Sequence, residues 1–75
     1  MIYVYDFCDA CADGEAVKIS FFDTDSNDFI TDVVLNNAKT GYKTLSAICG
    51  YAYVEYFYIS ADIISVKARV HREDL

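Results

Sequence analysis

Two cysteines stand three positions apart near the start of the chain, in a C-x-x-C pattern that runs from Cys8 to Cys11. This spacing allows two thiolates to bind one zinc ion or to join in a disulfide. Cys49 and the only histidine, His71, would complete a set of four zinc ligands. Aspartates flank the motif, and nearby negative charge raises thiol pKa values, whereas redox-active thiols need lowered ones. We therefore predict ordinary thiols and no cofactor, with a zinc-binding regulator as the third functional hypothesis.

An acidic segment, Asp23–Ile30, carries oxygen-bearing side chains at alternate positions. It resembles the opening of an EF-hand calcium loop, D-x-D-x-[DN]-G-x-I. Asp28 stands where that family has its turn-forming glycine, and Val34 stands where it has the glutamate that closes the site. The segment is therefore predicted to be a polar turn in which side chains take an Asx or helix-capping role.

Catalytic motifs are weak in this sequence. A hydrolytic triad needs a base beside a nucleophile, and His71 lies near the end of a predicted terminal strand, next to two arginines. The segment Lys39–Thr44 lacks the spacing of a phosphate-binding loop. We predict a protein that is not an enzyme.

The charge is negative and unevenly distributed along the chain. The chain has twelve acidic and six basic residues, for a net charge of −6. Residues 1–38 hold eight acids and one lysine, or −7, whereas residues 39–75 hold four acids and five bases, or +1. This balance is opposite to the basic footprint of a nucleic-acid binder, so direct nucleic-acid binding is not expected. Acids gathered on one face would instead steer a basic partner.

No run of apolar residues reaches the 18 or so that a membrane helix needs, and no basic flank of a signal peptide follows Met1. Three cysteines are an odd number and too few for a disulfide-stapled scaffold. We expect a cytoplasmic protein.

Periodicity predicts two hairpins. Residues 1–7 are rich in aromatic and β-branched side chains, and residues 16–22 alternate apolar with polar side chains. A turn around Asp13-Gly14 separates the two segments. Residues 51–59 and 63–71 form a second pair around Ser60–Asp62.

The middle of the chain permits two interpretations. Asp28 can cap a helix that runs to about Lys39 and stops at Gly41, followed by a second short helix over 40–49. Strands over 30–35 and 42–48 are the alternative. The predicted fold is therefore α+β, a single domain over 1–75 with an antiparallel four-stranded sheet and one or two short helices, and a small all-β barrel is the alternative.

The segment 51–59 carries large side chains on both faces of its predicted strand. Strict alternation would place Tyr51, Tyr53 and Phe57 on one face and Val54, Tyr56 and Tyr58 on the other. One layer of helices cannot cover both faces, so the second face either stays partly exposed to solvent or contacts another chain.

These features favour a small acidic protein that occupies the basic surface of a nucleic-acid-handling enzyme and so mimics nucleic acid. In size, acidity and scarcity of motifs the chain is similar to phage and mobile-element inhibitors such as anti-restriction and anti-CRISPR proteins. The alternative is a non-catalytic, homo-oligomeric assembly subunit, for example a homodimer, that uses the tyrosine-rich strand. The predicted partner-binding residues are Asp9, Asp13, Glu15, Asp23, Asp25, Asp28, Asp32, Tyr51, Tyr53 and Tyr58.

Overall fold

Two segments that alternate strictly between buried and half-buried residues form the middle of the sheet. In the computed structural model, which describes residues 1–75, these are β1 (Val17–Asp23) and β4 (Ile64–Val70). They run parallel to each other, with Ile19 paired to Val66. Every second side chain of both strands is buried on the same face because side chains alternate along a strand.

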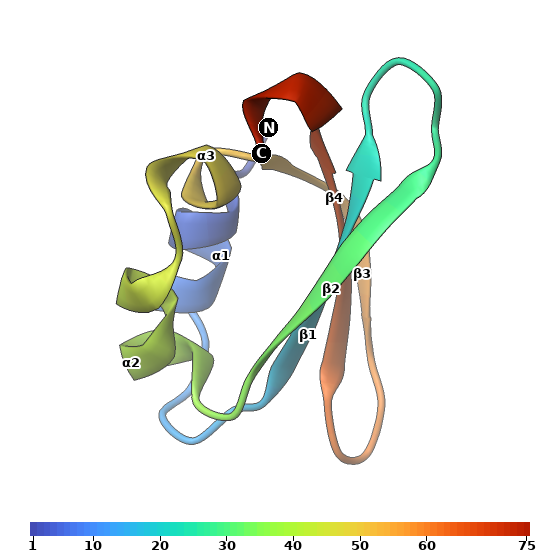
Figure 1. The fold of residues 1–75 in the computed structure, drawn as a ribbon. Helices are drawn as coiled ribbons and strands as arrows, with labels where there is room; N and C mark the ends of the chain where they lie inside the picture. Colours follow the sequence, from blue (N-terminus) through green and yellow to red (C-terminus); the bar gives the residue numbers. More distant parts are fainter.

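The two outer strands are more exposed. β2 (Phe29–Leu35) pairs antiparallel with β1, and β3 (Tyr53–Ile59) pairs antiparallel with β4, which gives the order β2-β1-β4-β3. The sheet is therefore mixed, formed from two antiparallel hairpins joined by a central parallel pair (Figure 1). It has two free edges and does not close into a barrel.

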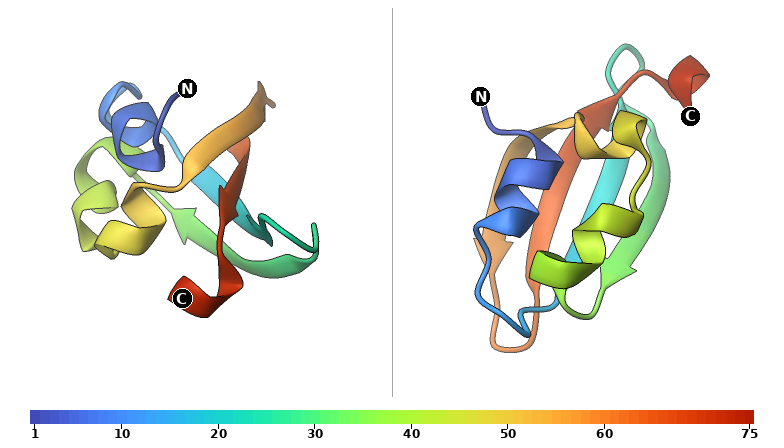
Figure 2. Two further views of the ribbon diagram at one scale, coloured as in Figure 1. Left: turned by 90° about the horizontal axis from the view of Figure 1, so that it is seen from above. Right: turned by 90° about the vertical axis from the view of Figure 1, so that its left-hand side faces the viewer.

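Short helical segments cover one face of this sheet (Figure 2). They are α1 (Val4–Asp9), α2 (Ala38–Gly41), the 3₁₀ turn η1 (Tyr42–Thr44) and α3 (Ala47–Gly50). A second 3₁₀ turn, η2 (Arg72–Asp74), follows β4 at the end of the chain. No helix has the length and apolar character needed to cross a membrane.

The core lies between this helical layer and the sheet. Phe21, Ile19 and Val17 of β1 are fully buried, and Val4 and Cys8 of α1 pack above the sheet. The opposite face of the sheet has no helix over it (Figure 2). All of its large side chains consequently end at or near the surface.

The prediction for residues 1–7 was wrong, because Val4–Asp9 is a helix. Val4, Phe7 and Cys8 are its buried residues, and Cys11 follows at the next position of the same face. This i, i+3, i+4, i+7 spacing is the pattern of an amphipathic helix. The aromatic and β-branched composition of the segment obscured that pattern, so the first hairpin was assigned to the wrong pair of segments.

The predicted helix from Asp28 to Lys39 was also wrong, because Phe29–Leu35 is the strand that pairs with β1. The alternative strand over 30–35 is confirmed, whereas the alternative strand over 42–48 is replaced by short helical turns. A third correction concerns the sheet, which is mixed rather than purely antiparallel. The α+β class, the four strands, the short helices and the hairpin of residues 51–59 and 63–71 are confirmed, whereas the hairpin of residues 1–7 and 16–22 is not.

Candidate functional site

The uncovered face of the sheet carries three rows of side chains that cross all four strands. Read from β2 to β3, the first row is Val34, Lys18, Ser65 and Tyr58. The second row is Asp32, Ser20, Lys67 and Tyr56. The third row is Phe29, Phe22, Arg69 and Tyr53. Five of these twelve side chains are aromatic. Each of the three rows ends with a tyrosine of β3.

An irregularity in β3 places all three tyrosines on one face. The register shifts between Val54 and Tyr56, so that Glu55 forms a β-bulge. The extra residue reverses the alternation, and Tyr53, Tyr56 and Tyr58 lie on the open face while Val54 and Phe57 lie on the face that carries the helices. The predicted grouping, which placed Phe57 with Tyr53 and Tyr56 with Val54, was therefore wrong.

Cations on β4 hold the only carboxylate of β3. Glu55 Oε2 lies 2.7 Å from Arg69 Nε and 3.7 Å from Lys67 Nζ. The hydrogen bond from Arg69 holds the pKa of the Glu55 carboxyl below its usual range. Lys67 Nζ also lies 4.4 Å from the ring centroid of Phe22 and 5.8 Å from that of Tyr56. The only charged side chain of β3 is therefore paired.

On the helical side, an apolar groove runs beside β3. It has a volume of about 330 Å³ and is lined entirely by hydrophobic residues: Ile2, Phe7, Ala10, Cys11, Phe57 and Ile64. The rings of Phe7 and Phe57 meet edge to face at 4.8 Å, which anchors α1 on the strand. Ile59, at the end of β3, has 70% of its surface exposed.

The outer edge of β3 is covered only at its beginning. The Val54 N–H donates a hydrogen bond to Ile2 O, and Tyr3 forms a bridge with Tyr53. From Glu55 to Ile59 no strand lies along this edge. The free stretch is thus flanked by the apolar groove on one face and by exposed tyrosines on the other.

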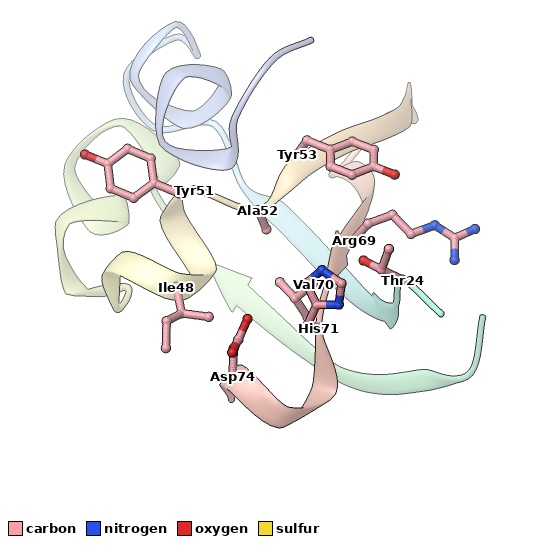
Figure 3. A pocket seen from close by; sticks show the side chains of 9 residues that line it. All are labelled: Thr24, Ile48, Tyr51, Ala52, Tyr53, Arg69, Val70, His71 and Asp74. Atoms are coloured by element: carbon pink, nitrogen blue, oxygen red, sulfur yellow. The ribbon is translucent and has the colours of Figure 1, made fainter. Parts of the chain in front are cut away.

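A second hollow, of about 300 Å³, lies where α3, β4 and η2 meet (Figure 3). His71, Arg69, Asp74 and Tyr51 are among its lining residues. His71 Nδ1 lies 3.5 Å from Asp25 Oδ2, and no hydroxyl or thiol donates a hydrogen bond to its ring. The structure thus places a carboxylate, and no nucleophile, beside the ring of His71.

The candidate zinc ligands are not brought together. Cys8 on the buried face of α1 and Cys11 just after α1 are buried, Cys49 is half-buried in α3, and His71 is exposed after β4. Burial, and then the neighbouring Cys11, raise the pKa of the Cys8 thiol to about 11. The only three metal-ligating side chains whose ligand atoms approach one another within 4.8 Å are exposed: Asp25, His71 and Glu73.

The predicted acidic residues are divided among three places. Asp9, Asp13 and Glu15 precede β1, whereas Asp25 and Asp28 follow it, and the seven residues of β1 span about 20 Å. Asp32 lies in the middle of β2, where its carboxylate accepts a 2.6 Å hydrogen bond from Ser20. Asp23 is buried and binds the backbone N–H groups of Ser26 and Arg72. These carboxylates do not share one face.

The predicted tyrosines separate as well. Tyr53 and Tyr58 lie on the open face of β3, whereas Tyr51 follows α3 and packs edge to face against Tyr3 and Tyr5. The predicted partner-binding residues leave out Tyr56 and Phe57, which the sequence placed only on the faces of the strand, and Ile59 and Ile2, which it did not single out. The signal that was present is an uninterrupted apolar and aromatic run after Glu55, which is unusual for a strand at a sheet edge.

Comparisons with family models, with curated proteins and with solved structures found no match.

Proposed function

We propose that this chain is a non-catalytic binding protein that engages another protein through the free edge of β3. The observation that carries the proposal is the stretch from Tyr56 to Ile59, which has an open backbone edge and exposed side chains on both faces. A strand added there would satisfy the backbone groups of the edge, while its alternate side chains would enter the apolar groove or contact the tyrosines.

Natural proteins usually protect such edges with charged residues, proline or coverage by another segment. β3 has no lysine, arginine or proline, and its one carboxylate is held by Arg69. The other edge strand, β2, carries an exposed charge at its centre, Asp32. The contrast supports β3 as the edge that another protein covers.

The proposal is tested by a photo-crosslinking amino acid placed at Tyr58 and, as a matched control, at Val34. The two positions end the same row of the open face, on opposite edge strands, and are 60% and 56% exposed. Irradiation in native cells is expected to join position 58, and not position 34, to a protein. Equal crosslinking at the two positions, or none at position 58, would contradict the proposal.

A second candidate function is occupation of a basic, nucleic-acid-handling surface. Exposed carboxylates at one end of the sheet favour it, since Asp25 and Asp28 follow β1 and Glu73 and Asp74 lie in η2. The double reversal Asp25→Lys and Asp28→Lys is then expected to abolish binding of the basic partner without unfolding the chain. Unchanged affinity would reject this candidate. The free thiols of all three cysteines fit either function in a reducing compartment such as the cytoplasm.

A further inference from the structure

We propose that the occupant of the β3 edge is a second copy of this chain, paired antiparallel with the first around a two-fold axis at Phe57. This inference rests on the proposed function, because it names the partner of the same edge. Phe57 is the middle residue of the free stretch Glu55–Ile59. Pairing centred there overlaps the whole free stretch of both copies and leaves the hydrogen bond from Val54 to Ile2 intact.

Charge is the first reason to place a second copy at β3 rather than at β2. Each chain has a net charge of −6, so most approaches of two copies bring unpaired carboxylates together. At β3 the only carboxylate of the strand, Glu55, is already held by Arg69 and Lys67, so self-pairing there brings no unpaired carboxylates of the two strands together. Self-pairing through the other edge, β2, would instead bring two copies of Asp32 close to each other. Electrostatics therefore favour β3 over β2.

Shape is the second reason. A two-fold axis perpendicular to the sheet joins two four-stranded sheets into one and keeps both helical layers on the same side. Phe57 and Ile59 of both copies then lie on that side, beside the apolar grooves that flank α1. On the open side, Tyr56 faces Tyr58 of the second copy, an aromatic cross-strand pair. Apolar surface thus meets apolar surface on both sides of the joined sheet.

The association is measured by sedimentation over a range of protein concentrations. Wild type is expected to change from monomer to dimer as concentration rises. Tyr58→Lys places a charge in the joined surface and is expected to raise the dimer Kd by about 30-fold or more, the effect of a residue at the centre of an interface. Val34→Lys, the same change at the matched position on β2, is expected to leave the Kd unchanged. Ile59→Lys repeats the test on the helical side.

All four proteins are checked for folding by circular dichroism, because only folded variants enter the comparison. The pairing is then tested with Tyr56→Cys and Tyr58→Cys variants, each in a Cys49→Ser background. A mixture is expected to form the mixed disulfide faster than either variant forms a disulfide with itself. A dimer that Tyr58→Lys and Ile59→Lys leave intact would overturn the inference and would also count against the β3 edge.

A chain that stays monomeric at all concentrations would overturn the second-copy inference alone. The proposed function would then still stand if photo-crosslinking at Tyr58 captured a different protein. The two failures are therefore distinguishable, since one concerns the identity of the occupant and the other concerns the edge itself.

Discussion

The carboxylate of Asp23 accepts a 2.7 Å hydrogen bond from the backbone N–H of Arg72, 49 positions further along the chain. Its other oxygen accepts hydrogen bonds from the backbone N–H and the hydroxyl of Ser26. One buried side chain therefore closes the turn between β1 and β2 and also fixes the chain after β4. The Asx role expected for this acidic segment is confirmed at Asp23.

We predict that Asp23→Asn destabilises the fold at neutral pH and that the loss disappears in acid. The backbone hydrogen bonds from Ser26 and Arg72 lower the pKa of the Asp23 carboxyl to about 2, below the unfolded value of about 3.9. A lowered folded-state pKa contributes stability that is complete above the unfolded pKa and is lost as pH falls through the folded one.

Urea unfolding of wild type and Asp23→Asn between pH 7 and pH 2 measures this effect. The difference in free energy of unfolding is expected to be constant down to about pH 5 and then to shrink toward pH 2. Asp28→Asn, at an exposed neighbouring position, is the control and is expected to behave as wild type. A difference that stays the same at pH 2 and pH 7 would contradict this role of Asp23.

We predict that Gly50→Ala destabilises the fold by about 1–3 kcal/mol, the cost typical of overpacking. A Cβ at Gly50 would overlap the ring of Tyr5, and that ring is held by a 2.7 Å hydrogen bond from its hydroxyl to Leu45 O. Gly41→Ala is the matched control, because its added Cβ would meet Leu35 at an ordinary 3.6 Å. Thermal unfolding of both variants checks the prediction. Equal stabilities would show that Tyr5 moves aside without cost.

We predict that Cys8 reacts with iodoacetamide at least about a hundredfold more slowly than an ordinary thiol in the folded protein. Its pKa of about 11 is two units above the usual value, which reduces the reactive thiolate by that factor near neutral pH. Mass spectrometry of peptides after timed alkylation gives the rate at each cysteine. Cys49, which is only half-buried, is the internal reference. Similar rates at Cys8 and Cys49 would contradict the buried position of Cys8 on the inner face of α1.

The parts of the fold that were predictable are those whose burial follows the sequence pattern. In β1 and β4 every second residue is buried, so alternation located both strands to within one or two residues. The prediction for residues 1–7 was wrong because the composition of the segment favours a strand while its apolar spacing favours a helix. Packing of Val4 and Phe7 against the sheet stabilises the helix. The parallel pairing of β1 with β4 depends on contacts between distant segments, which no local pattern specifies.

The candidate site was predictable only in outline. The two-faced character of the tyrosine-rich strand was visible, but its faces were not, because the bulge at Glu55 depends on pairing with β4. The acidic residues were conspicuous in sequence, yet β1 separates Asp13 from Asp25 by its full length. Burial of Asp23 also depends on Arg72, which lies near the other end of the chain.

The most direct test of the central claim, that a strand from a second copy covers the free edge of β3, is amide hydrogen exchange measured at dilute and at concentrated protein. Backbone amides between Glu55 and Ile59 are expected to exchange more slowly as concentration rises, since edge pairing with a second copy protects them. Amides of β2 on the opposite edge are expected to exchange at the same rate throughout. Exchange along β3 that is independent of concentration, or protection that appears on β2 instead, would contradict the account.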